Sequence, residues 1–348
     1  MKKVLFIFLA LAVVCGGLFA SGSQEKADSK PIIGMATDTN GLGDGSFNDG
    51  VYSGLKRAED EGLIEIRLIE PTSMTDYVPN LSGLSEDGAG LIFATGFLFY
   101  DAVLEVSEHY PETVFAGIDL SFDPSTMPSN VIGITWKEQE ASYLAGVVAG
   151  LMTDKYSNLS DKLNDKNVIG AVLGMDIPPV ERYIVGFTQG AKSVNPDIEV
   201  LSVVTGTFTD QAKGKEAAIA LSEQGADIVI QLAGLTGIGV FNAAQEKGFA
   251  AMGCDIDQSF LAKANTITSA RKGISEATYL TIKNYLSGDL KSGSNSEFGL
   301  AEGAINLAPF NDFEDIIPLE VREAVEKAKA GILDGSINVY STRAELGM

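Results

Sequence analysis

Short apolar runs alternate with longer amphipathic stretches from residue 31 onward. Apolar runs rich in Val, Ile, Ala and Phe are typical of buried strands in a parallel sheet. The stretches between them have the spacing of helices with one apolar face. In the first half this pattern predicts helices at 50–61, 77–86 and 100–109, and strands at 32–36, 66–69, 90–94, 113–118 and 131–134.

The second half of the chain repeats the same alternation. Strands that alternate with helices form parallel sheets joined by crossover helices. Two such units in series predict an α/β protein with two doubly wound lobes, and a ligand would bind in the cleft between them. The second unit has predicted helices at 179–194, 212–224 and 238–247, and predicted strands at 168–173, 199–204, 227–231 and 250–253.

Three further segments bear on the lobe boundaries. Residues 138–152 form a helical pattern rich in Ala and Gly, which we interpret as a buried helix packed tightly on a sheet rather than a membrane or dimer helix. An amphipathic helix at 318–331 and a strand at 337–340 indicate a chain that crosses between lobes more than once. We therefore place lobe 1 at 31–135, with part of 256–290 returning to it, and lobe 2 at 136–255, with part of 291–345 returning to it.

Length and charge narrow the functional classes. The 348 residues exceed what one hydrophobic core usually supports. The formal net charge is −22, and so acidic a surface repels nucleic acid and anionic lipid. The same charge disfavours a highly phosphorylated ligand. The composition therefore favours a binding protein for a small molecule over a nucleic-acid-binding protein.

The N-terminus is typical of an export signal. Lys2 and Lys3 precede an apolar stretch at 4–14 that is too short to span a membrane. Residues 1–22 are therefore predicted to be a signal peptide, followed by a polar tether at 23–30. Either Cys15 is lipidated and becomes the mature N-terminus, or cleavage follows Ala20 or Gly22. Both alternatives predict an exported protein, periplasmic or anchored to the cell membrane.

The first candidate site follows the first predicted strand, at 38–49, with the sequence DTNGLGDGSFND. Its Asp and Asn side chains can point into a cleft, and Phe47 can stack on a planar ring. The alternative is a turn in which Ser46 or Asp49 caps the next helix. A calcium loop is disfavoured because Leu42 occupies a position that needs an oxygen ligand. The segment also resembles the DTDPGxDD motif of nucleoside hydrolases, although several of its metal ligands are replaced.

Two more candidate segments follow later strands. The glycine-rich turn at 233–239 exposes backbone N–H groups, but helix packing explains it equally well. Asp255 follows the strand at 250–253, where its carboxylate suits a vicinal diol; the alternative is an Asp that closes a turn. Lys272 is able to donate to a ligand oxygen or neutralise Asp255, although an isolated lysine is more often a surface residue.

The residue types of common catalytic and metal sites are missing from the sequence. The single histidine, His109, lies at a predicted helix end, and Cys254 sits in an apolar run as a small buried side chain. No Ser-His-Asp set and no metal-ligand spacing is present. We therefore predict no enzyme activity, no cofactor and no metal.

With these segments in view, the chain resembles the basic membrane lipoprotein family of ABC-transporter substrate-binding proteins, and most closely its spirochaetal purine nucleoside receptors. The resemblance runs nearly end to end, so it is specific. It rests on GDGSFN at 43–48, QEASYLAG at 139–146, GMDIP at 174–178, VGFTQG at 185–190, GADI at 225–228, TGIG at 236–239, DIDQ at 255–258 and TSARK at 268–272.

This resemblance implies a type I periplasmic-binding-protein fold with a three-strand hinge. It also implies a monomer that delivers a nucleoside, with purine preferred, to permease and ATPase subunits of an importer. The base would lie between Phe47 and Phe187. Trp136, Leu235 and Cys254 depart from the family pattern. The remaining polar contacts would come from Asp38, Asp44, Asn48 and Asp119, and the ribose contacts from Gly234, Asp255 and Lys272.

Three other functions remain as alternatives to a nucleoside receptor. A receptor for a sugar or other polar metabolite would not need aromatic rings on both lobes. A calcium-dependent nucleoside hydrolase would release free base. A sensor or adhesin would keep the fold without a partner importer.

Overall fold

The computed structural model describes residues 30–348. The predicted signal peptide at 1–22, the lipidation site Cys15 and all but the last residue of the tether at 23–30 lie outside the described residues. Within the described part of the chain, no helix combines the length and hydrophobicity needed to cross a bilayer.

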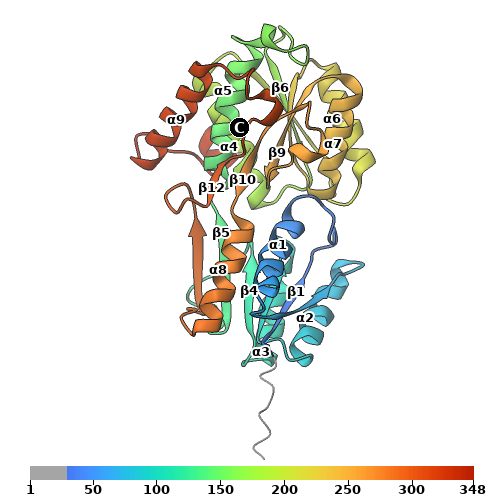
Figure 1. Ribbon diagram of the computed structural model, residues 1–348, viewed down its shortest axis with the longest axis vertical. Coiled ribbons are helices and arrows are strands. Elements are labelled where there is room, and N and C mark those ends of the chain that lie inside the picture. The colour runs from blue at the N-terminus through green and yellow to red at the C-terminus, as the bar shows by residue number, and fades with distance from the viewer. Residues whose placement is uncertain (1–29) are drawn as a thin grey trace, which may run out of the picture. The chain divides into compact units, whose positions relative to one another are not determined.

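Two six-stranded sheets form the cores of two lobes (Figure 1). The sheet of lobe 1 has the order β11-β5-β4-β3-β1-β2, and all of its strands are parallel. Its strands are β1 (Ile32–Ala36), β2 (Glu65–Ile69), β3 (Leu91–Thr95), β4 (Val114–Ile118), β5 (Val131–Trp136) and β11 (Ser294–Phe298).

The sheet of lobe 2 has the order β12-β10-β9-β8-β6-β7, with β12 antiparallel to β10 and the other pairs parallel. Inner strands of both sheets, such as β3 and β8, are buried at every position, which explains their continuous apolar sequences. The strands of lobe 2 are β6 (Val168–Leu173), β7 (Glu199–Val204), β8 (Ile228–Leu232), β9 (Ala250–Asp255), β10 (Thr266–Lys272) and β12 (Ile305–Leu307).

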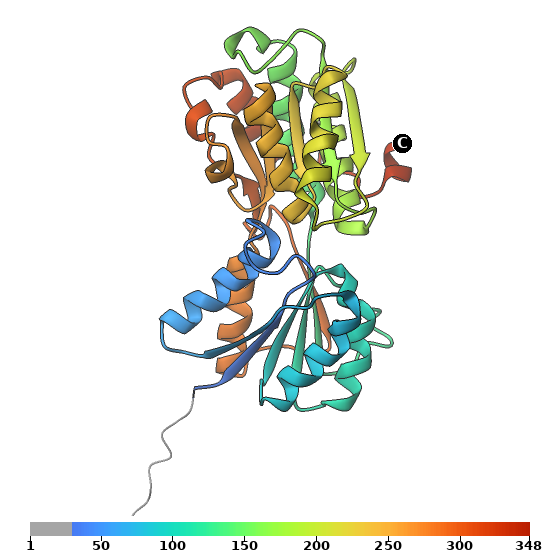
Figure 2. The same cartoon turned by 90° about the vertical axis from the view of Figure 1, so that its right-hand side faces the viewer.

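Helices cover both faces of each sheet. In lobe 1, α1 and α8 pack together, as do α2 and α3, and Figure 2 shows the two pairs on opposite faces of the sheet. In lobe 2, α4 packs with α5 and α6 with α7. The helices are α1 (Phe47–Asp60), α2 (Tyr77–Glu86), α3 (Tyr100–His109), α4 (Glu138–Thr153), α5 (Pro178–Val194), α6 (Gln211–Glu223), α7 (Gly234–Lys247), α8 (Ile274–Ser287), α9 (Leu319–Leu333) and α10 (Arg343–Leu346).

The chain crosses between the lobes three times, and the crossings form the hinge. They lie between β5 and α4, between β10 and α8, and between β11 and β12. Residues 274–298 therefore belong to lobe 1, whereas β12, α9 and α10 belong to lobe 2. These positions place Trp136 and Lys272, the last residues of β5 and β10, at the start of two crossings.

The predicted strand at 337–340 is wrong. The segment has no ladder partner, and its backbone is held instead by the side chain of Gln189 on α5. The Gln189 amide donates to the carbonyl of Asn338 at 2.9 Å and accepts from the N–H of Tyr340 at 2.9 Å. This side chain satisfies the backbone groups that a neighbouring strand would otherwise pair.

The Ala- and Gly-rich segment is a buried helix, as we interpreted it from the sequence. Nearly every residue of α4 is buried, and its backbone lies directly against that of α5. A side chain at Gly190 of α5 would place its Cβ 2.0 Å from the carbonyl oxygen of Tyr143, and one at Gly146 would lie 2.1 Å from that of Phe187. The small residues therefore serve close helix packing.

Candidate functional site

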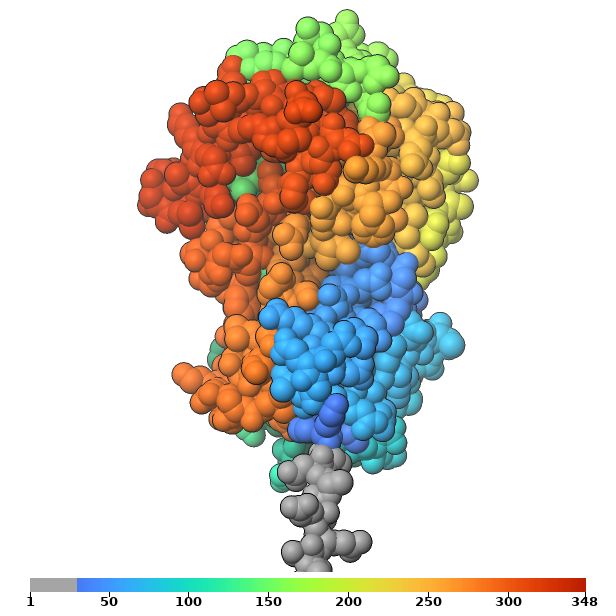
Figure 3. Space-filling view, viewed as in Figure 1, coloured from blue at the N-terminus to red at the C-terminus, as the bar shows by residue number. Residues whose placement is uncertain are grey.

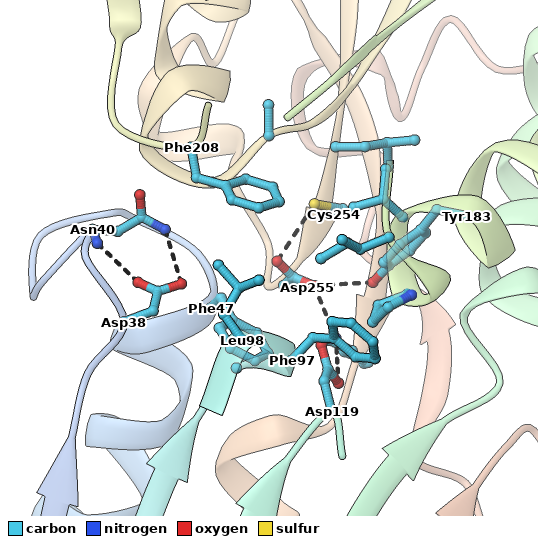
Figure 4. Close-up of a pocket in the computed structure, with 18 residues that line it drawn as sticks. Asp38, Asn40, Phe47, Phe97, Leu98, Asp119, Tyr183, Phe208, Cys254 and Asp255 are labelled. Carbon is cyan, nitrogen blue, oxygen red and sulfur yellow. Dashed lines mark hydrogen bonds and ion pairs between the residues drawn. The ribbon is translucent and has the colours of Figure 1, made fainter. Parts of the chain in front are cut away.

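A cavity lies between the two lobes, at the carboxyl ends of their strands (Figure 4). About 630 Å³ of space lies between the protein atoms in this region, and this figure includes open solvent. Six residues predicted from the sequence line it together: Asp38, Phe47, Asp119, Gly234, Asp255 and Lys272.

Two aspartates occupy equivalent positions in the two lobes. Asp119 follows β4 and Asp255 ends β9, and each strand is the third from the edge formed by β11 or β12. The backbone of both residues is in the left-handed region, with φ of +62° at Asp119 and +64° at Asp255. Asp tolerates this conformation better than most residues. The turn brings both carboxylates to the sheet edges that face the cavity. The hydroxyl of Tyr183 donates to Oδ1 of Asp255 at 3.0 Å.

Lys272 lines the cavity and joins the two lobes. Its Nζ lies 2.8 Å from Asp119 Oδ2, 3.4 Å from Glu138 Oε1 and 3.7 Å from Asp255 Oδ1. The side chain is 2% exposed, so the surface interpretation of Lys272 is wrong. Burial alone would lower the pKa of Lys272, but the three carboxylates outweigh it and hold this pKa above its ordinary value. The ammonium therefore stays charged.

Glu138, which the sequence analysis did not single out, completes this network. It is fully buried at the first turn of α4 and pairs with Arg182 of α5 as well as with Lys272. Burial raises the pKa of Asp119 to about 6, although Lys272 opposes the shift. Asp119 is therefore ionised at neutral pH. The network brings together the three carboxylates of Asp119, Glu138 and Asp255 and the two cations Lys272 and Arg182.

The loop before α1 positions Asp38 and Phe47. Asn48 donates its side-chain Nδ2 to Asp38 Oδ1 at 2.8 Å, and the amide of Asn40 donates to Asp38 Oδ2 at 3.1 Å. Burial raises the pKa of Asp38, against the lowering effect of these bonds from Asn48 and Asn40. Asn40 itself lines the cavity and lies against Gly234 of lobe 2.

Asp44 and Asn48 were predicted to contact the ligand, and the structure corrects both assignments. Neither lines the cavity, and both are fully buried. Asp44 accepts from the backbone N–H of Ser46 at 2.9 Å and of Asn48 at 2.8 Å, so it does the capping expected of Ser46 or Asp49. Both side chains shape the loop that carries Asp38 and leads to Phe47 at the start of α1.

Asp44 makes stability depend on pH. Burial raises its pKa from the ordinary 3.8 to about 6, and the hydrogen bonds from Asn48 and Ser46 only partly oppose this. Between these two pH values the folded protein binds more protons than the unfolded chain, so stability falls as pH rises through the window. We expect the free energy of unfolding, measured with urea, to be about 1–3 kcal/mol higher at pH 5 than at pH 7.5.

Asp227 adds to the same effect, because burial also raises its pKa to about 6. Exposed carboxylates such as Asp76, whose pKa is lowered by the Thr72 side chain, titrate below this window. The variant Asp44→Asn should show a weaker dependence between pH 5 and 7.5. A wild-type stability that rises across this range would contradict the prediction.

Phe187 is not among the aromatic side chains that line the cavity, which are Phe47 and Phe97 from lobe 1 and Tyr183 and Phe208 from lobe 2. Phe187 has no exposed surface, lies in the core of lobe 2 and does not line the cavity, so its assignment as a stacking residue is wrong. Phe208, in the loop after β7, lines the cavity from lobe 2, while Phe47 lines it from lobe 1 (Figure 4). The only sequence signal for Phe208 was an aromatic residue within the polar stretch TGTFTD.

Cation–π contacts hold Phe47 in place. Nζ of Lys272 lies 4.8 Å from the centroid of the Phe47 ring and 5.3 Å from that of Trp136. Such contacts are typical of Lys within about 6 Å of a ring.

Cys254 is buried, as predicted, but it also lines the cavity, where burial raises the pKa of its thiol well above the ordinary value.

The first loop does not offer the carboxylate ligands of a calcium site. Both oxygens of Asp44 accept backbone N–H groups, and Asp49 is bonded to the N–H of Gly43 and of Gly45. Within residues 30–348, no group of three or more His, Cys, Asp or Glu side chains is arranged to hold a metal ion.

Comparisons with known proteins identify the same family over most of the chain. The family model described as "ABC transporter substrate-binding protein PnrA-like" matches residues 32–343. Basic membrane protein A1 of Borrelia garinii is 30% identical over 97% of this chain and 96% of its own, and an uncharacterized lipoprotein of Pyrococcus abyssi is 34% identical over 92% and 83%. A solved structure of ABC transporter solute-binding proteins from Aeropyrum pernix is 27% identical, with a TM-score of 0.82 over 90% of this chain and 94% of that one.

Proposed function

Because the chain belongs to the PnrA-like family of ABC-transporter substrate-binding proteins, we propose that it captures a nucleoside, with a purine base preferred, and delivers it to a membrane permease. The observation that carries the proposal is the pair of aromatic rings, Phe47 and Phe208, that line one cavity from opposite lobes. Stacking of a flat base between such rings contributes about 1–3 kcal/mol per base.

The polar groups around these rings suit the hydroxyl and N–H donors of a nucleoside. Asp38, Asp119 and Asp255 supply carboxylate acceptors, and the carboxylate of Asp255 has acceptor sites beyond those that Tyr183 and Ser46 use. We propose that Asp255, Gly234 and Lys272 hold the ribose, and that Asp38 and Asp119 provide the other polar contacts. A sugar alone would leave the rings without a partner.

The charges of the cavity disfavour a nucleotide. Among the lining residues in the described part of the chain, Lys272 is the only cation, and Asp119, Glu138 and Asp255 already surround it. A phosphate would therefore face carboxylates without a free counter-charge. We therefore propose a nucleoside, and not a nucleotide, as the ligand.

Export and partners follow from the same proposal. We propose that residues 1–22 direct the chain out of the cytoplasm, with Cys15 lipidation or cleavage near Ala20 as the two alternatives. The exported protein would act as a monomer with the permease and ATPase subunits of an importer. Closure of the lobes over the ligand would give the form that the permease recognises.

Calorimetry with inosine, guanosine and adenosine tests the ligand. We expect each to bind at least about 100-fold more tightly than free ribose or the matching monophosphate, because ribose lacks the stacking surface and the phosphate adds repulsion. Chromatography of the same mixtures, with and without calcium, should recover intact nucleoside. Release of free base at enzymatic rates would contradict the receptor function, and equal affinity for ribose would contradict the assignment of a base.

A further inference from the structure

The loop before α1 is hydrogen-bonded directly to lobe 2 at Asp255, which lines the cavity. The hydroxyl of Ser46 donates to Oδ2 of Asp255 at 2.6 Å, and Nε2 of Gln258 donates to the carbonyl oxygen of Gly45 at 2.9 Å. Ser46 and Gln258 are fully buried, so these bonds are shielded from water. Figure 3 shows the start of α1 against the surface of lobe 2 on this side of the molecule.

On lobe 1, hydrogen bonds within the loop hold it in the conformation that these interlobe bonds require. Asp44 fixes the backbone N–H of Ser46 at 2.9 Å, and Asp49 fixes that of Gly45 at 2.9 Å. Ser46 stands at the N-cap position of α1, yet its hydroxyl makes no capping bond. Because Asp44 satisfies the helix start, the Ser46 hydroxyl is available to lobe 2.

On lobe 2, Gln258 is equally constrained. Its Oε1 accepts from the backbone N–H of Cys254 at 3.0 Å and from the amide of Gln231, and its backbone N–H donates to Ser269 at 3.1 Å. Two donors at Oε1 fix the orientation of the amide, so Nε2 must point toward Gly45 of lobe 1. The two lobes therefore form these hydrogen bonds with little loss of side-chain conformational entropy.

We propose that Ser46 and Gln258 form a latch between the lobes and that Ser46 is the positioning residue that sets how long a ligand stays bound. The proposal rests on the proposed function, because Asp255, which accepts from Ser46, is also the residue proposed to hold the ribose. One carboxylate thus receives the latch hydroxyl, the Tyr183 hydroxyl and the ligand. Closure and ligand binding stabilise each other through it.

The latch acts on release more than on entry. A ligand enters while the lobes are apart, when Ser46 and Asp255 are not yet bonded, so the association rate does not depend on the latch. Release requires the Ser46 and Gln258 bonds to break first. Loss of the latch should therefore raise the dissociation rate constant and leave the association rate constant nearly unchanged.

The variant Ser46→Ala tests the latch with inosine and guanosine in stopped-flow fluorescence. We expect the dissociation rate constant to rise about tenfold or more, as for the loss of a hydrogen bond to a charged group, and the association rate constant to change less than about twofold. Spin labels on Asp87→Cys and Glu223→Cys, exposed positions of the two lobes, should report longer distances in Ser46→Ala than in wild type without nucleoside.

Two variants separate the latch from a general effect on α1. Ser53→Ala removes a hydroxyl further along α1, where it is hydrogen-bonded to Ser275 within lobe 1. This control should leave the association and dissociation rate constants and the spin-label distances unchanged. Ser46→Thr keeps the hydroxyl and should restore slow release. If Ser46→Ala fails to fold, Ser46→Cys supplies a weaker donor of similar size and should show a smaller change in the same direction.

The outcomes distinguish the latch from the proposed function. Unchanged dissociation and unchanged distances in Ser46→Ala would overturn the latch while leaving nucleoside binding intact. If wild type binds no nucleoside, the proposed function fails, and the label distances without nucleoside still decide the latch. Longer distances in Ser46→Ala alone, with Ser53→Ala matching wild type, support it in either case.

Discussion

Replacing Phe208 by alanine is expected to weaken nucleoside binding by about ten- to a hundredfold and to leave the free energy of unfolding within about 1 kcal/mol of wild type. Replacing Phe187 by alanine should lower the free energy of unfolding by about 3–5 kcal/mol. Calorimetry with inosine measures the first effect, and urea unfolding measures the second.

The different surroundings of the two rings explain this contrast. Phe208 lies in a loop and lines the cavity, so its removal leaves the core of lobe 2 intact. Phe187 is fully buried on α5 where that helix packs against α4, so its removal leaves a hole among rigid helices. Close backbone contact at Gly146 and Gly190 prevents the helices from collapsing into such a hole.

The pair of variants serves as its own control, because both remove the same ring from the same lobe. The Phe187→Ala protein that remains folded should bind inosine with wild-type affinity. A Phe187→Ala variant that stays stable but loses inosine binding would show that Phe187 contacts the ligand. A Phe208→Ala variant with unchanged affinity would contradict the proposed stacking pair.

The strands buried on both faces could be predicted from the sequence because their apolar runs are continuous. The strands that complete each sheet could not. β11 has the polar sequence SNSEF, β12 has only three residues, and β10 ends in Arg271 and Lys272. Their positions depend on the chain returning between lobes, which a local pattern does not record. The false strand at 337–340 has a different cause: its sequence is apolar except for Asn338, but the Gln189 side chain takes its backbone hydrogen bonds.

The site shows the same limit. Asp255 could be found because a polar residue after a buried strand lies at the sheet edge, whereas Asp119 came only from the family resemblance. Glu138 could not, because it stands in a helical pattern and its partners Arg182 and Lys272 are distant in sequence. The family resemblance implies ligand contacts for Lys272 and Phe187. Lys272 lines the cavity, whereas Phe187 lies on α5 in the core of lobe 2, and the ring that lines the cavity is Phe208 after β7.

Lys272→Met is expected to lower the free energy of unfolding by about 3–5 kcal/mol at pH 7.5, as when one partner of a buried ion pair is removed. Methionine has nearly the length of the lysine side chain, so packing changes little. The loss comes from charge, because Asp119, Glu138 and Asp255 then lie around a site without its ammonium. Urea unfolding measures the effect, with exposed Lys283→Met of α8 as the matched control that should remain near wild type.

The pH dependence identifies the cause. Burial already raises the pKa of Asp119, and Lys272 is the main group that lowers it, so Lys272→Met should raise this pKa further. A carboxyl whose folded-state pKa exceeds its unfolded value destabilises the fold more as pH rises through the folded-state value. The deficit of Lys272→Met should therefore shrink between pH 7.5 and pH 5, and adding Asp119→Asn should recover part of it at pH 7.5. A deficit that is equal at both pH values would mean that Lys272 stabilises the lobes through packing and not through its charge.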